Sequence, residues 1–302
     1  MNNSPAGNDY FRLHFIIAIF GFTIILGQLT QTSSLGVVLW RTVLAISGIF
    51  VIALIRRTRL LISWKVALPI MAIGAVLALH WVCFFGSAKV SNISVSLVCL
   101  STTSFFTSFL EPLMLKKKKF SGIEVFLGLF VVIGMYFVFR FEGHYSLGIT
   151  IGLIGAVLAS LFGILNARIA SRHTPLLNMF YQMSGALVGS IFFIPFFVFF
   201  SKQPLSIMPT GYDWLWLTIL ALGCTVYPYL ELVLLFRKFS AYFVSLSVNM
   251  EPVYGIILAY LIFGDKERMT TGFYIGGLLI LASVLLFPVL QRMKTRDIPI
   301  KK

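Results

Sequence analysis

The side chain best placed for chemistry in this 302-residue sequence is the carboxylate of Glu251, which lies in the middle of an apolar run and directly precedes Pro252. Proline removes a backbone donor and leaves a carbonyl without its helical partner, so the helix must satisfy that carbonyl from protein or from a wet cavity. Asn249 stands two residues before the carboxylate. We interpret Glu251 as part of a cavity wall, where it coordinates a solute or accepts a proton; structural pairing is the alternative reading.

Two basic side chains occupy apolar runs in the first half. Arg41 follows Leu39-Trp40 and is expected about two turns from the outer end of its helix. It either reaches the lipid headgroups or helix carbonyls, or it offers a fixed positive charge to an anionic or zwitterionic solute. His80 precedes Trp81 and serves either as an interhelical hydrogen bond or as a polar contact for the solute. No second His or Cys stands at metal-ligand spacing, so we predict no metal site.

Hydroxyl groups and aromatic rings complete the candidate site. Thr103 belongs to the polar run 101–104, whose hydroxyls bond either to their own helix or to a solute. Tyr227 and Glu231 indicate a second stretch of cavity wall, although tyrosine near a membrane interface is usually an anchor. We find no hydrolase, zinc-protease or nucleotide-binding motif, and we therefore predict a protein that is not an enzyme and uses no cofactor.

The amino-acid composition indicates that these residues lie in membrane-spanning helices. The chain is 59% hydrophobic and 11% charged, with a mean hydropathy of +0.95, whereas soluble domains contain roughly 25% charged residues. A spanning helix needs about 20 apolar residues. We therefore predict an all-α integral membrane protein with ten transmembrane helices, near 13–31, 35–55, 66–86, 92–115, 121–139, 147–167, 176–200, 214–236, 241–263 and 270–290.

An internal repeat arranges the ten helices. The pattern Lys89-x-Ser91-x-x-x-Val95-Ser96-Leu97 returns 149 positions later as Lys238-x-Ser240-x-x-x-Val244-Ser245-Leu246. The period is about half the chain and so predicts two homologous five-helix repeats, 13–139 and 147–288. Five helices per repeat is an odd number, so the second repeat enters the membrane from the opposite side. Inverted repeats with the site between them are typical of secondary transporters.

The basic residues predict the orientation. With the N-terminus inside, 18 Lys and Arg residues fall on the cytoplasmic side and 5 on the outer side. Both termini are therefore expected in the cytoplasm, with the chain in the cell (inner) membrane. The net charge of +14 is then explained by topology and by attraction to anionic lipid, and we predict no nucleic-acid partner.

Small residues four positions apart suggest close helix contacts. The spacing predicts packing within the bundle, with a homodimer face as the alternative. The pairs are Gly148 and Gly152, Gly185 and Gly189, and Gly272 and Gly276.

Four motifs together resemble the EamA-type branch of the drug/metabolite transporter superfamily. They are Leu79-His80-Trp81, Ser87-Ala88-Lys89-Val90-Ser91, Glu251-Pro252 and Phe263-Gly264-Asp265-Lys266-Glu267. The resemblance implies a basket in which helices 1–4 and 6–9 enclose a cavity while helices 5 and 10 lie outside. The helix-4 proline of the family is replaced here, since Thr103 stands opposite Pro252. We therefore expect a kink mainly in helix 9.

We predict a secondary transporter, an exporter or permease, that moves small organic metabolites or amino acids across the cell membrane by alternating access. Glu251 would accept a proton or coordinate the solute, Arg41 and His80 would add polar contacts, and Tyr227 with Asn249 would shape the cavity. Ion channels and membrane scaffolds or sensors are the alternative classes.

Overall fold

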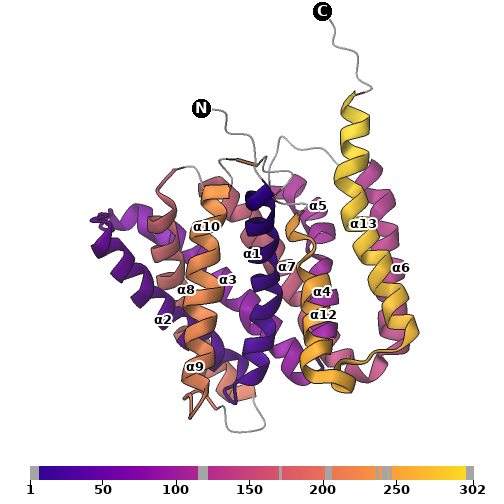
Figure 1. Cartoon of the computed structure of the whole chain (residues 1–302), viewed down its shortest axis with the longest axis horizontal. Helices are drawn as coiled ribbons and strands as arrows, with labels where there is room; N and C mark the ends of the chain where they lie inside the picture. The colour runs from indigo at the N-terminus through magenta and orange to yellow at the C-terminus, as the bar shows by residue number, and fades with distance from the viewer. Residues whose placement is uncertain are drawn as a thin grey trace, which may run out of the picture.

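The structure, a computed structural model, describes residues 7–114, 122–169, 172–200, 206–235, 238–239, 244 and 247–296, and no strand occurs among them. Figure 1 shows the helices as a bundle. They are α1 (Gly7–Leu29), α2 (Ser34–Ile55), α3 (Trp64–Val90), α4 (Ile93–Ser101), α5 (Thr103–Met114), α6 (Gly122–Phe141), α7 (Ser146–Ile169), α8 (Pro175–Phe200), α9 (Asp213–Thr218), α10 (Tyr227–Leu235), α12 (Glu251–Phe263) and α13 (Thr271–Arg296), with the short helical turns η1 (Gly143–Tyr145), η2 (Ile219–Val226) and η3 (Gly264–Glu267).

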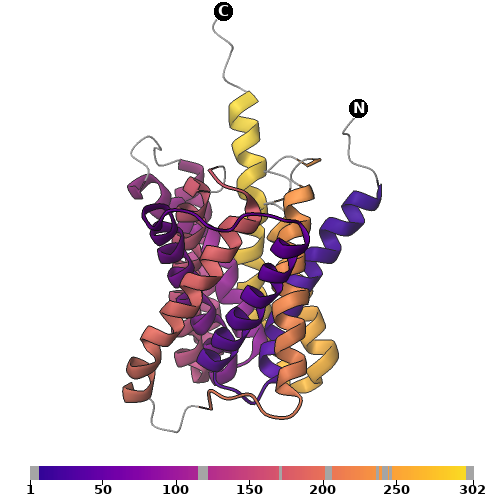
Figure 2. The ribbon, with the colours of Figure 1, turned by 90° about the vertical axis from the view of Figure 1, so that its left-hand side faces the viewer.

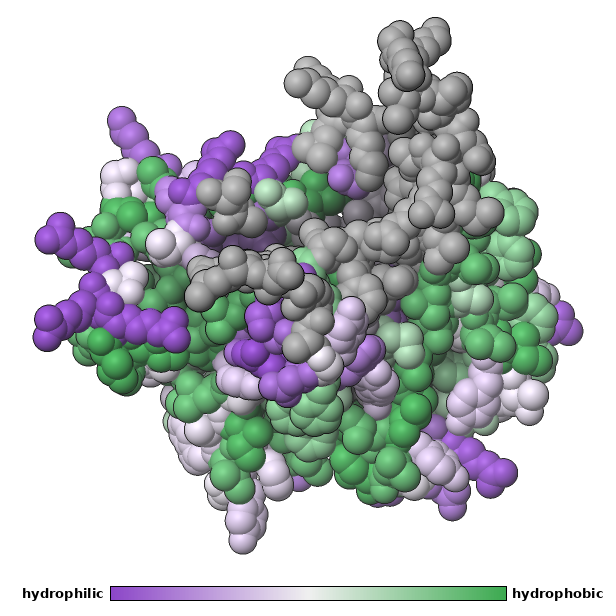
Figure 3. All heavy atoms as spheres, turned by 45° about the horizontal axis from the view of Figure 1, so that its top comes forward, coloured by the Kyte–Doolittle hydropathy of each residue, from purple (hydrophilic) through white to green (hydrophobic). Residues whose placement is uncertain are grey.

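Seven helical segments of the described chain are long and apolar enough to cross a membrane. Apolar stretches of α6 (Phe126–Phe141) and α13 (Thr271–Ser283) are shorter, and α12 is the described part of the ninth expected span. Large apolar side chains face outward, such as Phe199 at 82% and Phe192 at 77% exposure. In Figure 3 hydrophobic residues cover much of the visible flank. Such a surface is suited to lipid, and the chain is a multi-pass membrane protein.

Helices α6 and α13 pair with each other at one edge of the bundle (Figure 1). They meet the remaining helices mainly through α4 and α5. This position agrees with the expectation that the fifth and tenth helices lie outside the basket. Figures 1 and 2 also show that α1 begins and α13 ends at the same end of the bundle.

The glycine pairs singled out in the sequence pack inside this chain. Gly185 and Gly189 of α8 face Met71 and Ala75 of α3, and Gly276 of α13 faces the main chain of α6. Gly148 and Gly152 of α7 likewise meet residues of α3 and α4. Each pair lets two helices approach more closely than a larger side chain would permit, so the packing interpretation accounts for all three.

The first half contains a helix break that the sequence analysis did not expect. Helix four is interrupted at Thr102, between α4 and α5, and helix nine turns at 249–250, just before α12. The expectation of a kink mainly in helix nine is therefore wrong. Without a proline, the Thr102 and Thr103 hydroxyls donate to the carbonyls three residues back, those of Cys99 and Leu100, at 2.6 Å. Such side-chain bonds compete with the helical ladder and permit the turn.

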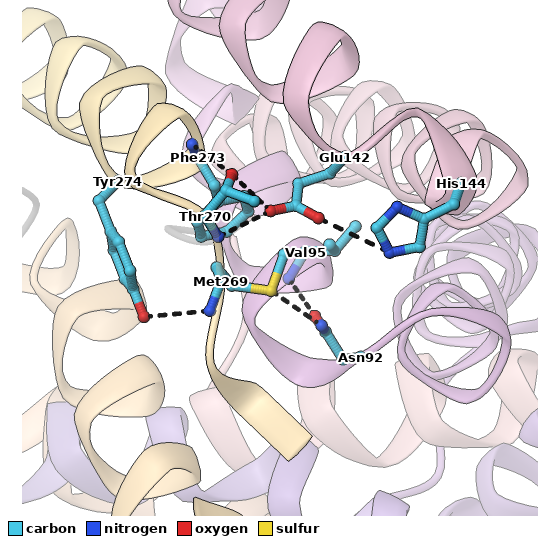
Figure 4. Close-up of polar contacts among 8 residues, drawn as sticks. All are labelled: Asn92, Val95, Glu142, His144, Met269, Thr270, Phe273 and Tyr274. Atoms are coloured by element: carbon cyan, nitrogen blue, oxygen red, sulfur yellow. Dashed lines mark hydrogen bonds and ion pairs between the residues drawn. The ribbon is translucent and has the colours of Figure 1, made fainter. Parts of the chain in front are cut away.

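Polar side chains join the two halves at the end of the bundle opposite the termini. Figure 4 shows the Glu142 carboxylate facing Thr270, whose backbone N and Oγ1 donate to it at 2.9 and 2.8 Å. Asn92 caps α4 by accepting from the Val95 backbone N at 2.9 Å, and its Nδ2 reaches the Met269 sulfur at 3.0 Å. These contacts fix the start of α13 and the start of α4 against each other.

A buried carboxylate from the second half caps α4 as well. Glu267 is 4% exposed and accepts hydrogen bonds from the backbone N of Ile93, at 3.1 Å, and of Ser94, at 2.9 Å. The Ser94 hydroxyl donates to the same carboxylate at 2.9 Å. A negative charge at this position satisfies the free N–H groups of the first helical turn and complements its dipole.

Candidate functional site

Arg41 lies inside the protein rather than at a headgroup level. It projects from α2 with only 4% of its surface exposed. Its Nε donates to Thr225 Oγ1 at 2.8 Å, while Nη1 is buried and has no hydrogen-bond partner among the described residues. Burying a guanidinium with an unpaired donor costs free energy in a membrane protein, so Arg41 is a candidate functional residue.

Aromatic rings of α3 support the guanidinium. The Arg41 Cζ lies 3.8 Å from the ring centroid of Trp81 and 5.9 Å from that of Phe85. A cation over the face of tryptophan is attracted by the ring quadrupole. The Trp81 ring therefore lies against the guanidinium and helps to hold it in place.

A π-helical segment, which the sequence analysis did not predict, carries the hydrogen-bond acceptor of Arg41. The turn η2 interrupts the helix formed by α9 and α10. In it, Thr225 Oγ1 donates to the Leu220 carbonyl five residues back, at 2.8 Å, while accepting from Arg41. Such wide turns occur frequently at functional sites. The only signal in the sequence is one threonine within an apolar run, which is too weak to identify it.

Glu251 enters the same region from the second half. It is the first residue of α12, and Pro252 occupies the first turn, where a missing N–H costs nothing. Glu251 is partly buried. No ion pair joins it to Arg41 among the described residues.

Close packing holds the main chain of Glu251 against α1. A Cβ added at Gly21 would lie 2.8 Å from the Gly255 N and 3.0 Å from the Glu251 carbonyl oxygen. A Cβ at Gly255 would lie 2.6 Å from Cδ1 of Leu97 in α4. Only glycine permits this approach, and helices from both halves therefore converge beside the first turn of α12.

His80 directly precedes Trp81, the residue whose ring lies over Arg41, in α3. It is 9% exposed, and its Nδ1 donates to the Gly155 carbonyl of α7 at 2.9 Å. Its ring also stacks on Phe84, with centroids 5.9 Å apart. These contacts make His80 a bridge between α3 and α7 at the border of the site.

The remaining predicted site residues are less closely associated. Asn249 lies in the turn before α12 and is partly buried. The Thr103 hydroxyl is occupied by the Leu100 carbonyl. Tyr227 is 45% exposed and so faces outward. The structure therefore buries Arg41 and His80 within the bundle and leaves Glu251 partly buried, while Tyr227 lies on the bundle surface.

Glu231, the other carboxylate of this region, is part of an ionic network. It accepts from Arg12 of α1, and Asp9 pairs with Lys238 at 2.8 Å. These pairs tie the start of α1 to the end of α10. Within the described chain, no three His, Cys, Asp or Glu side chains come together in a way that could hold a metal ion.

Removal of the Thr225 hydroxyl tests whether it secures Arg41. Thr225→Val keeps the side-chain shape but leaves Arg41 Nε without its acceptor, and we expect a loss of about 1.5–3 kcal/mol, the usual value for a hydrogen bond to a charged group. Thermal unfolding of the detergent-purified protein measures it. Thr218→Val is the matched control, because that hydroxyl bonds only to the carbonyl of Trp214 in its own helix. Equal unfolding temperatures for the two variants would contradict this role.

Comparison with known families decides what kind of site this is. Residues 146–288 match the model of the EamA-like transporter family. This segment, residues 146–288, belongs to the EamA-like transporter family. The resemblance seen in the sequence motifs is thereby confirmed, and with it the classification as a membrane transport protein of the drug/metabolite superfamily. Transporters of this family are not enzymes in the usual sense.

The fold of this EamA-like transporter recurs in solved structures. One crystal structure aligns with a TM-score of 0.61 at 15% identity and covers 95% of this chain and 99% of its own. At this identity the likeness establishes the shared fold alone. No curated protein matches the chain.

Proposed function

We propose that this chain is a secondary transporter, an exporter or permease, that carries small organic metabolites or amino acids across the cell membrane by alternating access. The observation that carries the proposal is that each half places an ionisable side chain within its apolar helices, Arg41 in α2 and Glu251 at the start of α12. Ionisable groups are expensive within a membrane, and they characteristically mark substrate or ion pathways. Membership of a transporter family supports the same conclusion.

The proposed architecture is ten spans in two inverted repeats, 13–139 and 147–288. The main helix contacts support it, because exchanging each helix with its counterpart in the other half reproduces them. The contact of α1 with α12 corresponds to that of α7 with α4 and α5, and the contact of α3 with α8 corresponds to that of η2 with α2. The pairs α6 with α13 and α4 with α12 are their own counterparts.

Inverted halves provide two ways to open the site. Rocking one half against the other around a fixed centre exposes that centre to each side in turn. The breaks at Thr102 and before Glu251 lie at equivalent positions of the repeat and provide the flexible points. We place both termini in the cytoplasm, since 18 of the 24 Lys and Arg residues then lie on that side.

Transport is tested in liposomes that contain the purified protein and an internal pH-sensitive dye. Amino acids and small metabolites are screened, and every solute that moves is tested again with Glu251→Gln. We expect solute-driven proton movement that disappears in the variant, because a carboxamide accepts no proton. Asp265→Asn, an exposed carboxylate in the loop after α12, is the control and should behave as wild type.

Other outcomes are equally informative. Solute flux without proton movement in wild type and variant alike would mean facilitated diffusion, with Glu251 as a wall of the cavity. Absence of flux for the whole panel would refute the proposed function.

A further inference from the structure

We propose that the connection between α2 and α3 binds the phosphate groups of anionic membrane lipids. It lies at the end of the bundle where α1 begins and α13 ends, because α1 runs away from that end and α2 returns to it (Figures 1 and 2). The inference concerns the lipid around the protein and goes beyond the proposed transport function, so it can fail while that function stands. The residues of this α2–α3 surface are Arg56, Arg57, Arg59, Leu61, Trp64 and Lys65.

The α2–α3 surface carries positive charge without an acidic neighbour in the sequence. Its three arginines and Lys65 are exposed, and none of them forms an ion pair with a described residue. No Asp or Glu occurs between positions 51 and 68. Guanidinium groups present N–H donors that match the oxygens of a phosphate, and basic clusters beside a membrane helix attract anionic lipid.

Apolar side chains among the cations place this surface at the membrane. Leu61 is 94% exposed, and Trp64 is 65% exposed. Tryptophan is enriched where a membrane meets water, because its ring is apolar and its N–H is polar. In Figure 3 hydrophilic side chains project from the edge of the molecule on the side of α2, directly beside hydrophobic ones. A lipid headgroup layer offers partners to both kinds of side chain.

Arg57 occupies a backbone position that favours glycine. Helix α2 ends in a Schellman motif, in which the Arg57 N donates to the Leu54 carbonyl at 3.1 Å. The Thr58 N donates to the Ala53 carbonyl at 2.9 Å. Arg57 has a φ of 51°, the only positive φ of a non-glycine residue in the described part of the chain. Arg56 already supplies a cation to the helix end, so the strained Arg57 points to a further role for its charge.

Packing holds the connection in place. Ile62 of the connection and Val66 of α3 pack against a buried aliphatic cluster. This cluster joins α3 to the end of α7 and the start of α8, so lipid bound at the α2–α3 surface would steady the start of α3. Its members are Ile70, Ile73, Ile169 and Leu177.

A lipid titration of the full-length protein in neutral detergent tests the inference. The additives are dioleoylphosphatidylglycerol, dioleoylphosphatidylcholine with the same acyl chains, and glycerol phosphate, which has no chains. The rise in unfolding temperature gives an apparent affinity for each. We expect phosphatidylglycerol to reach half of its effect at a concentration at least about fivefold lower than phosphatidylcholine does, because a basic residue near an anionic surface contributes about fivefold. Added salt should weaken this preference.

Three variants locate the effect. Arg57→Gly and Arg59→Gln should each require about fivefold more phosphatidylglycerol. Without lipid, Arg57→Gly should unfold at the same or a higher temperature than wild type, because glycine adopts the left-handed conformation without strain. Lys266→Gln is the control: it also removes one exposed charge, but at the opposite end of the bundle, and should bind lipid as wild type does.

Three outcomes would overturn the inference. In the first, phosphatidylglycerol is no better than phosphatidylcholine. In the second, Arg57→Gly and Arg59→Gln respond to lipid as Lys266→Gln does, which would mean that Arg57 serves only the end of α2. In the third, glycerol phosphate stabilises as well as phosphatidylglycerol, and the surface then binds free phosphate rather than lipid. None of these results bears on solute flux in liposomes.

Discussion

Gly185→Val is expected to prevent the third and seventh spans from packing together, and to leave little folded protein. A Cβ at this position would meet the carbonyl oxygen and Cα of Met71, and one at Gly74 would meet the main chain of Gln182. Backbone atoms in the middle of α3 cannot move aside as a side chain can. Overpacked cores typically lose about 1–3 kcal/mol, and we place this contact at the upper end of that range or beyond.

Gly185→Val would also disturb the candidate site, because α3 carries His80 and Trp81. A displaced α3 would withdraw the ring that covers Arg41. The yield of monodisperse protein after size-exclusion chromatography and its unfolding temperature measure the effect. Gly163→Val is the matched control: this glycine lies on the exposed side of α7, and nothing stands within 4 Å of an added Cβ. Equal behaviour of the two variants would mean that α3 and α8 are not tightly packed.

Glu267→Gln is expected to have the second large effect, because it removes the negative cap of α4. Two backbone N–H groups and one hydroxyl donate to this buried carboxylate. The amide keeps one acceptor oxygen but turns an NH₂ group toward donors and removes the charge. Hydrogen bonds to charged groups contribute about 1.5–3 kcal/mol each, so a total loss of roughly 2–5 kcal/mol follows. Because Glu267 is buried, water does not replace these bonds.

The expected result is a lower unfolding temperature and weaker coupling between the halves, since the carboxylate belongs to the second half and the helix it caps to the first. Asp265→Asn provides the comparison, because Asp265 lies in the same turn but is exposed. If the two variants unfold alike, the contacts of Glu267 contribute little. In that case the Asn92 cap alone would hold the start of α4.

Part of the architecture was readable from the chain because lipid imposes simple demands. Long apolar runs with few charges predict spanning helices, and seven of the predicted spans appear as helices of sufficient length. The glycine spacing predicted close packing, and the structure places these glycines against other helices. The helix break at Thr102 was missed, because the sequence rule looks for proline whereas hydroxyl groups achieved the same result.

The sequence analysis also identified the charged residues of the candidate site, but it did not predict which residues they contact. Arg41, His80 and Glu251 stood out because ionisable residues are rare in apolar runs. They lie up to 210 positions apart in the sequence, which gives no indication of their partners. Tyr227, chosen as an aromatic group near a cavity, faces outward. The sequence likewise did not reveal that Glu231 pairs with Arg12, because Arg12 lies near the other end of the chain.

The sequence by itself determined that the protein lies in a lipid membrane, that it is helical and which family it resembles, because hydropathy and motifs are local properties of the chain. Only the tertiary structure decided that the Trp81 ring lies over Arg41, that a π-helical segment places Thr225 next to its Nε, and that the main chain of Glu251 packs against Gly21 of the first half. These relations depend on how helices cross. Crossing is set by close contacts such as Gly21 with Gly255, which join residues far apart in the chain and leave no periodic trace in it.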